Sequence, residues 1–189
     1  MTKRIGILGG TFDPPHNGHL LMAELVRESM QLDGIWLLPA NVPPHKQGTS
    51  TPSVLRAEMA NLAADTNEYF NVQDIELKRT GVSYTFDTVK ILKDLYPKNE
   101  FYFIIGADMI AYLPKWHKIE ELSKLIQFVG VNRTGYPVKS KYPVHLVDIP
   151  AIDLSSTAIR ARIREQRTVK YMLPDTIIHF IKEHQLYED

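Results

Sequence analysis

The sequence has no cysteine and no surplus of charge of either sign, and each absence narrows the possible functions. Without cysteine among its 189 residues, the chain can form no disulfide, no thiolate metal site and no cysteine nucleophile. Lysine and arginine together number 22, as do aspartate and glutamate, so the formal net charge at pH 7 is zero. No overall positive field attracts nucleic acid or an anionic membrane, and any anion-binding site must therefore be local.

Long apolar runs are also missing. The apolar run near the N-terminus ends at Gly9, too soon for a signal peptide or a membrane-spanning helix, and no later segment approaches the length of a membrane span. We therefore expect a cytoplasmic protein that binds no membrane. With 189 residues and 44% hydrophobic content, the chain is predicted to form a single domain over residues 1–189.

Apolar runs of strand length alternate with segments of helical periodicity along the whole chain. Strands are predicted over residues 5–8, 35–38, 70–75, 101–105, 128–131 and 144–147. Helices are predicted over residues 18–30, 54–64, 85–95, 109–113, 119–125, 156–164 and 175–184. This alternation predicts an α/β fold, an open doubly wound parallel sheet with helices on both faces. Such sheets bind ligands at the carboxyl ends of their strands.

The most informative segment follows the first predicted strand and reads Gly9-Gly10-Thr11-Phe12-Asp13-Pro14-Pro15-His16-Asn17-Gly18-His19. Adjacent glycines let backbone amides approach a phosphate, and the following helix start presents unpaired N–H groups. His16 and His19 are three residues apart, which at a helix start puts both rings on one side. Two imidazoles there can donate hydrogen bonds to phosphate oxygens and add charge as a pentacoordinate phosphorus forms.

Each of these features alone is typical of an ordinary turn or helix entry, but together, directly behind a strand, they favour phosphoryl chemistry. The segment lacks the G-K-[ST] ending of a Walker loop, and it is not a G-x-G-x-x-G dinucleotide fingerprint. No third ligand at metal spacing accompanies the two histidines, so we predict no protein-bound metal.

A second candidate phosphate site reads Leu154-Ser155-Ser156-Thr157-Ala158-Ile159-Arg160. Serine at a helix start caps free amides, and its hydroxyl, the amides and an arginine one turn later can form an anion cradle. Taken alone, the segment is more typical of an ordinary N-cap with a surface arginine. Its pairing with the first segment favours phosphate binding.

Both segments resemble signatures of the nucleotidyltransferase superfamily. His16-Asn17-Gly18-His19 matches the H-x-G-H motif after the first strand, and residues 154–160 match I-S-S-T-x-x-R with leucine in place of isoleucine. The resemblance implies a Rossmann-like nucleotidyltransferase fold, with His16, His19 and Arg160 as the catalytic residues. The ATP-binding residues that it implies are Gly9, Gly10, Thr11, Phe12, His16, His19, Gly106, Asp108, Ser155, Ser156, Thr157 and Arg160.

Further segments resemble the nicotinate-nucleotide adenylyltransferase branch, so the resemblance covers nearly the whole chain. They are Pro43-Pro44-His45-Lys46, Ser83-Tyr84-Thr85-Phe86-Asp87-Thr88, Ile105-Gly106-Ala107-Asp108 and Leu113-Pro114-Lys115-Trp116. In this branch an aromatic ring stacks on the pyridine, at the position of Trp116, and amides around Thr85 and His117 receive the pyridine carboxylate. The implied phosphate contacts are His45, Lys46 and Arg133, although this chain has Thr134 where the family usually has proline.

The resemblance implies that nicotinate mononucleotide attacks the α-phosphorus of ATP, giving deamido-NAD and pyrophosphate, a step of NAD biosynthesis. Mg²⁺ would arrive with the ATP phosphates. The alternatives are adenylyl transfer to pantetheine phosphate or another small phosphate, cytidylyl transfer from CTP, and ATP binding without turnover. Trp116 with Thr85 favours the nicotinate acceptor, and intact His16, His19 and Arg160 favour turnover. A homodimer is the expectation from base rates for soluble enzymes.

Overall fold

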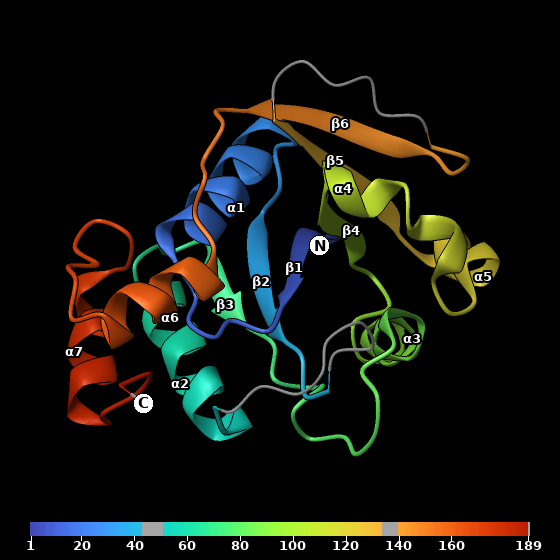
Figure 1. Cartoon of the computed structure of the whole chain (residues 1–189). Helices are drawn as coiled ribbons and strands as arrows, with labels where there is room; N and C mark the ends of the chain where they lie inside the picture. Colours follow the sequence, from blue (N-terminus) through green and yellow to red (C-terminus); the bar gives the residue numbers. More distant parts are fainter. Residues whose placement is uncertain (43–50, 134–139, 189) are drawn as a thin grey trace.

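The computed structural model describes residues 1–42, 51–133 and 140–188, and it confirms the predicted α/β fold (Figure 1). All strand pairs of its six-stranded sheet are parallel, and the strand order is β3-β2-β1-β4-β5-β6. The strands are β1 (Arg4–Gly10), β2 (Gly34–Pro39), β3 (Phe70–Val72), β4 (Glu100–Gly106), β5 (Gln127–Arg133) and β6 (Val144–Ile149). The order reverses between β1 and β4, which is where doubly wound sheets bind their ligands.

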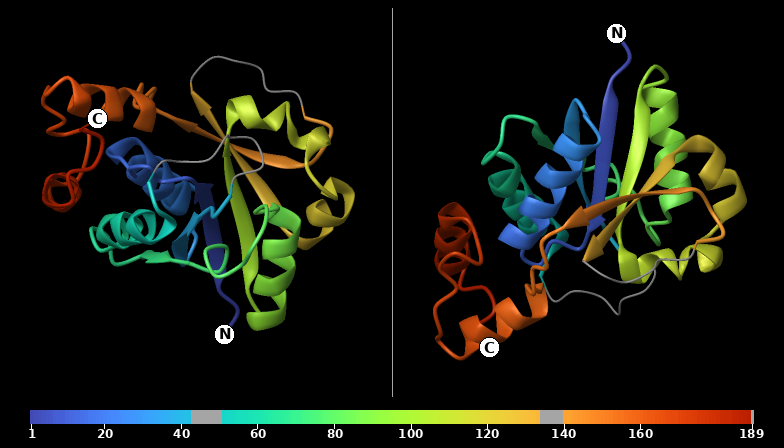
Figure 2. Two further views of the ribbon diagram at one scale, coloured as in Figure 1. Left: turned by 60° about the horizontal axis from the view of Figure 1, so that its bottom comes forward. Right: turned by 90° about the horizontal axis from the view of Figure 1, so that it is seen from above.

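Helices cover both faces of the sheet, and the views in Figures 1 and 2 agree on their division. One face carries α1 (Asn17–Ser29), α2 (Ser53–Ala64), α6 (Ser156–Arg164) and α7 (Asp175–Glu183). The other carries α3 (Thr85–Leu95), α4 (Ala107–Ile110) and α5 (Ile119–Leu125), with the short 3₁₀ helix η1 (Leu113–Lys115) between the last two. Within the described ranges, none of the helices combines the length and the apolar character needed to cross a membrane.

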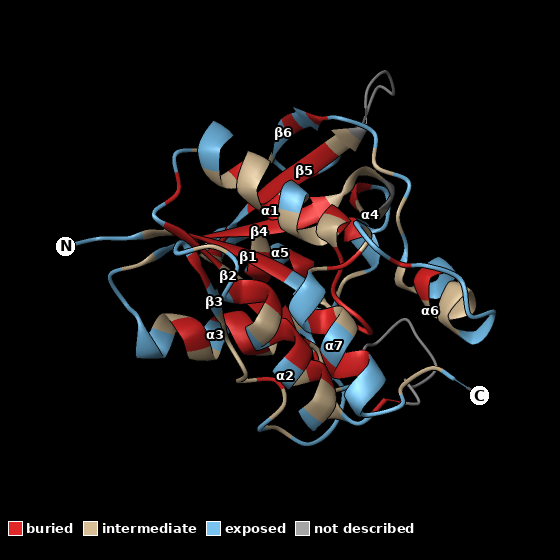
Figure 3. Cartoon of the chain, turned by 90° about the vertical axis from the view of Figure 1, so that its left-hand side faces the viewer, coloured by how far each residue is buried: buried red, intermediate tan, exposed pale blue. Residues whose placement is uncertain are grey.

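Two hydrophobic clusters form the core, one on each face of the sheet. Because side chains alternate across a strand, Leu8 joins the cluster under α1, α2 and α7, while Ile7 joins the cluster under α3 and α5. On β4, Ile104 and Phe103 divide in the same way. Figure 3 shows the central strands buried and the helices exposed on their outer sides. Burial on both faces explains why these strands read as nearly continuous apolar runs.

Two predicted elements were wrong in their bounds. The predicted strand 70–75 ends at Val72, because the chain then turns and the Asp74 carbonyl accepts the N–H of Leu77 at 2.9 Å. Two short helical segments take the place of the predicted helix 109–113. The first, α4, ends at Ile110, and the second, η1, has a proline in its first turn. Proline has no N–H to donate but fits the first turn of a helix, so Pro114 belongs to the first turn of a new helical segment and does not continue the previous one.

The loop between β1 and α1 is buried although it has no regular secondary structure. Residues 12–16 are all buried, so their backbone polar groups need partners inside the protein. Arg56 on α2, which is only 1% exposed, donates to the carbonyl of Thr11 at 2.8 Å and to the carbonyl of Ala40 at 2.7 Å. Longer hydrogen bonds of 3.3 Å reach the carbonyls of Thr51 and Asn41. One guanidinium therefore joins the segments that follow β1 and β2.

Replacing Arg56 by methionine keeps most of the buried volume but removes all of these donors. Each buried acceptor left without a partner costs about 1–3 kcal/mol, so we expect the free energy of unfolding to fall by at least about 2 kcal/mol. The control is Arg167→Met, because Arg167 is 58% exposed and pairs with Glu165 at 3.1 Å on the surface. Its loss should cost less than about 1 kcal/mol. Urea unfolding measures both values, and equal losses would contradict the role of Arg56.

Candidate active site

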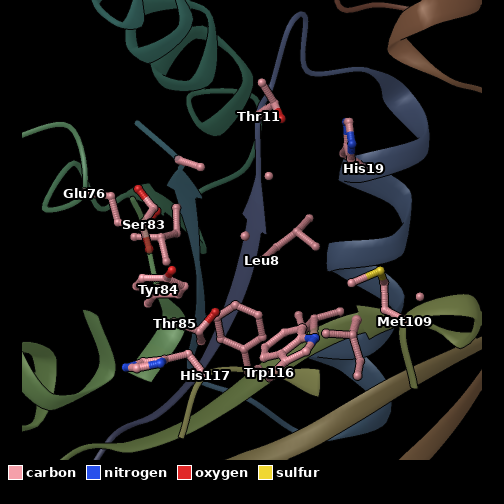
Figure 4. A pocket seen from close by; sticks show the side chains of 18 of the residues that line it. Leu8, Thr11, His19, Glu76, Ser83, Tyr84, Thr85, Met109, Trp116 and His117 are labelled. Atoms are coloured by element: carbon pink, nitrogen blue, oxygen red, sulfur yellow. The ribbon is translucent and has the colours of Figure 1, made fainter. Parts of the chain in front are cut away.

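A pocket of about 590 Å³ opens at the carboxyl ends of β1 and β4, where the strand order reverses. Figure 4 shows Thr11 and His19 toward one end of this pocket and Thr85, Trp116 and His117 toward the other. The pocket is also lined by the last residues of β1 and β4, which include Gly9, Gly10 and Gly106. The structure therefore brings some of the residues predicted to bind ATP into one cavity with residues predicted to bind the acceptor, whereas His16 and Arg160 are not among the residues that line it.

The two histidines of the H-x-G-H motif stack at the start of α1. Their ring centroids are 3.7 Å apart and the rings are inclined by 21°. The backbone N–H of His16 donates to Nδ1 of His19 at 3.2 Å. Because Nδ1 of His19 accepts this hydrogen bond, the neutral ring carries its proton on Nε2. His19 lines the pocket with Nε2–H as the hydrogen-bond donor of its ring.

His16 is much more buried than a typical histidine. It is 5% exposed, and burial lowers its pKa to about 4, so the ring is neutral at neutral pH. Its Nδ1 has no hydrogen-bond partner within the described part of the chain. The buried His16 ring is thus a neutral hydrogen-bond donor or acceptor in this structure, whereas the sequence led us to expect that both imidazoles add charge.

Small residues and one strained residue shape the loop around the histidines. A Cβ atom on Gly18 would lie 3.0 Å from Nδ1 of His16, so glycine leaves room for that ring. Phe12 has a φ of 51°, in the left-handed region, and its ring packs edge-on against His19 with the centroids 5.2 Å apart. The Phe12 side chain is 1% exposed and belongs to the core. Any contact of Phe12 with ATP would therefore come from its backbone.

The two sequence motifs, far apart in the chain, meet in the structure. Oγ of Ser156 donates to the carbonyl of Pro14 at 2.8 Å, and Nη1 of Arg160 donates to the carbonyl of Asp13 at 2.7 Å. These hydrogen bonds satisfy acceptors of the buried loop between β1 and α1. They also fix the start of α6 beside the start of α1.

The predicted N-cap of α6 is confirmed. Oγ of Ser155 accepts the N–H of Ala158 at 3.2 Å. Thr157 makes a longer contact, in which its Oγ1 accepts from Nη2 of Arg160 at 3.4 Å. The Arg160 guanidinium is therefore held between its own helix and the loop that precedes the motif histidines.

Trp116 lies at the opposite end of the pocket and packs against two phenylalanines. Its ring is perpendicular to those of Phe103 and Phe128, with centroid distances of 5.8 and 6.0 Å. These contacts fix the plane of the indole. Nε1 of Trp116 is buried and has no hydrogen-bond partner in the part of the chain that the structure describes.

The start of α3 forms the wall next to Trp116. Thr85 is the first residue of this helix, and the N-cap residue Tyr84 makes no side-chain capping hydrogen bond. The rings of Tyr84 and His117 lie 4.5 Å apart, and both residues line the pocket beside Thr85. The positive end of the helix dipole at this wall favours an anionic group.

Glu76 is a buried carboxyl group in the same wall that the sequence did not reveal. It is 5% exposed, and it accepts the hydroxyl of Thr88 at 2.8 Å. Burial raises the pKa of Glu76, and hydrogen bonds from Thr88 and Ser83 act in the opposite direction. Oγ of Ser83 in turn accepts the N–H of Asn41 at 3.2 Å. A single glutamate after a short strand gives no sequence signal of burial, so this support could not be predicted.

Some predicted site residues are placed only in part. Asp108 lies in α4 directly after β4, and Arg133 is the last residue of β5, so both are at the carboxyl edge of the sheet. His45 and Lys46 lie outside the residues that the structure describes.

Known proteins resemble this chain over nearly its whole length. The family model described as cytidylyltransferase-like matches residues 7–162. A probable nicotinate-nucleotide adenylyltransferase of Oceanobacillus iheyensis is 54% identical over 185 residues, which cover 98% of this chain and 97% of that protein. The nicotinate-nucleotide adenylyltransferase of Bacillus subtilis is 51% identical over 187 residues, covering 98% of this chain and 99% of that protein.

The fold is also that of a solved enzyme. The Plasmodium falciparum nicotinic acid mononucleotide adenylyltransferase complexed with NaAD superimposes with a TM-score of 0.81 over 98% of both chains, at 22% sequence identity. At that identity the similarity concerns the fold, whereas the bacterial relatives establish the family. The chain therefore belongs to the cytidylyltransferase-like family and, within it, to the nicotinate-nucleotide adenylyltransferases.

Proposed function

We propose that this chain transfers the AMP part of ATP to nicotinate mononucleotide, giving deamido-NAD and pyrophosphate. The observation that carries this proposal is that one pocket holds the H-x-G-H histidine His19 toward one end and Trp116 beside the start of α3 toward the other. The family assignment supports the same reaction. Within this proposal the enzyme works in the cytoplasm and forms a homodimer, as is common for soluble enzymes.

In the proposed reaction, a phosphate oxygen of the acceptor attacks the α-phosphorus of ATP in line. A new P–O bond forms as the bond to the bridging oxygen breaks, and pyrophosphate leaves with that oxygen. A phosphate monoester loses its second proton at a pKa of about 6, so the nucleophile is mostly ionised at neutral pH and needs no strong general base. The protein must instead hold two anions together and stabilise the charge that develops, with Mg²⁺ carried on the ATP phosphates.

The residues around the loop between β1 and α1 suit this task. Nε2–H of His19 can donate to an α-phosphate oxygen, and the neutral His16 ring beside it can add a hydrogen bond without adding charge. Arg160 has five N–H donors, so it can hold the Asp13 carbonyl and still contact a phosphate. The remaining proposed ATP contacts are Gly9, Gly10, Thr11, Phe12, Gly106, Asp108, Ser155, Ser156 and Thr157.

The other end of the pocket suits a pyridine carboxylate. The Trp116 ring offers an aromatic surface of fixed orientation for the pyridine. The start of α3 at Thr85, together with His117, offers hydrogen-bond donors and a positive dipole end for the carboxylate. His45, Lys46 and Arg133 remain the proposed contacts of the acceptor phosphate.

The experiment that tests this function is ATP-dependent pyrophosphate release with a panel of acceptors, namely nicotinate mononucleotide, its amide analogue and pantetheine phosphate. We expect the best turnover with nicotinate mononucleotide. The amide should have a kcat/KM about 5- to 150-fold lower, because donors arranged for a carboxylate would be left poorly paired at a cost of about 1–3 kcal/mol. No pyrophosphate release with nicotinate mononucleotide would overturn the function, and equal use of acid and amide would remove the carboxylate site.

In the same assay, Trp116→Ala should raise the KM for nicotinate mononucleotide far more than the KM for ATP. Stacking of a base on an aromatic side chain is worth about 1–3 kcal/mol, or about 5- to 150-fold in affinity. Trp116→Phe keeps an aromatic face and should lose less. Trp36→Ala is the control, because Trp36 packs against Tyr96 and Phe101. An acceptor KM unchanged by Trp116→Ala would assign Trp116 to the core alone.

His19→Ala should lower kcat by about 10²–10³-fold, the cost of removing one donor from a comparable electrostatic site. The fold should persist, which circular dichroism can verify. The control is His179→Ala on α7, since His179 is exposed and its Nδ1 lies 2.8 Å from the backbone oxygen of Asp175. A kcat close to that of the wild type in the His19 variant would exclude His19 from the mechanism.

The burial of His16 predicts a loss of stability in mild acid. Its pKa is about 4 in the folded protein and near 6.5 in an unfolded chain, so between these values the unfolded chain binds an extra proton. This group therefore lowers the free energy of unfolding as the pH falls from 6.5 to 4, by about 1.4 kcal/mol per pH unit. His16→Gln should show a shallower pH dependence in this window. Identical slopes for the two proteins would contradict the neutral, buried state of His16.

A further inference from the structure

Tyr187 follows α7 in the chain, yet its hydroxyl reaches the loop between β1 and α1. It donates to Oδ1 of Asp13 at 2.6 Å, across a separation of 174 residues. Tyr187 has a φ of 66°, in the left-handed region that disfavours residues with a side chain, and its ring packs against the core cluster under α1, α2 and α7. The chain thus adopts an unfavourable backbone conformation at the residue that makes this contact.

Asp13 is the point at which several distant segments meet. It is only 4% exposed, and both its side chain and its backbone are hydrogen-bonded. The carboxylate accepts from Tyr187, while the carbonyl accepts from Nη1 of Arg160 at 2.7 Å. Asp13 lies three residues before His16, in a stretch that no strand or helix holds in place. Its orientation therefore depends on these side-chain contacts.

The pKa shifts of the groups around Asp13 are consistent with its hydrogen bond to Tyr187. Burial lowers the pKa of Arg56, and the nearby Asp13 and Tyr187 act in the opposite direction, so the three groups lie within electrostatic reach of one another. The pKa of Tyr187 is raised, first by burial and then by its hydrogen bond to Asp13, so its hydroxyl keeps the proton and remains a donor. The buried carboxylate thus lies within electrostatic reach of a buried guanidinium and accepts a hydrogen bond from a fixed hydroxyl.

We propose that Tyr187 is a positioning residue for adenylyl transfer, because by holding Asp13 it fixes the loop that sets His16, His19 and Arg160 around the reacting phosphates. This role rests on the proposed function, since it concerns the placement of the same catalytic residues. A misplacement of about 1 Å can cost about 10²-fold in rate. Trp116 and the start of α3 lie at the other end of the pocket, so the effect should fall on kcat and not on the acceptor KM.

The first test is Tyr187→Phe, which removes the hydroxyl and keeps the ring in the core. We expect kcat to fall by about ten-fold or more. The KM for nicotinate mononucleotide should stay within about two-fold of the wild-type value, because stacking on Trp116 is untouched. The matched control is Tyr171→Phe, which makes the same chemical change at a tyrosine with a φ of 67° that is 83% exposed. Its kcat should equal that of the wild type.

A double-mutant cycle separates positioning from a general loss of stability. If Tyr187 acts through Asp13, the double variant Tyr187→Phe with Asp13→Asn should lose no more kcat than the more impaired single variant. Additive losses of kcat would overturn the proposal, as would a lower melting temperature in Tyr187→Phe with an unchanged kcat. No pyrophosphate release by the wild type would refute the proposed function and this role together. Turnover by the wild type with an unchanged kcat in Tyr187→Phe would refute only the role of Tyr187.

Discussion

A stretch of backbone without regular secondary structure, residues 12–16, lies buried at the carboxyl end of β1, and its polar groups must find partners inside the protein. Side chains from α2 and α6 and from the segment after α7 supply those partners. Arg56 donates to the carbonyl just before this stretch, Ser156 and Arg160 donate to carbonyls within it, and Tyr187 binds the carboxylate of Asp13. The contacts that allow the loop to be buried are therefore the contacts that place the motif histidines.

The fold could be predicted from the sequence because its signals are local. Strands buried on both faces read as apolar runs, and the predicted helices 85–95, 119–125 and 156–164 have the bounds found in α3, α5 and α6. The start of α6 was predicted correctly for the same reason, because the N-cap Ser155 is a local signal. The prediction failed at 70–75 and 109–113, where a turn after Val72 and a proline after Leu113 decide the structure and apolar spacing does not.

The candidate site was predictable only where its geometry follows from nearby residues. The spacing of His16 and His19 predicted their common side of the helix, and their rings stack. The partners of Arg56 and Tyr187 could not be predicted, because helical periodicity indicates which residues share a face but not whether a polar group there meets a distant carbonyl or carboxylate. The charge state of His16 was missed for a related reason, since it depends on how deeply the assembled fold buries the ring.

Hydrogen bonds also link the two ends of the pocket. The Arg56 guanidinium binds the Thr11 carbonyl on the side proposed for ATP and the carbonyls of Ala40 and Asn41 after β2. The N–H of Asn41 continues this path to Ser83, which precedes the start of α3. Two phosphate-bearing substrates repel each other, and their reacting atoms must nevertheless come within about 3–3.5 Å. One buried cation fixes the two walls of the pocket to each other. The walls can therefore hold the two anions at a set separation, because moving either wall apart would break buried hydrogen bonds.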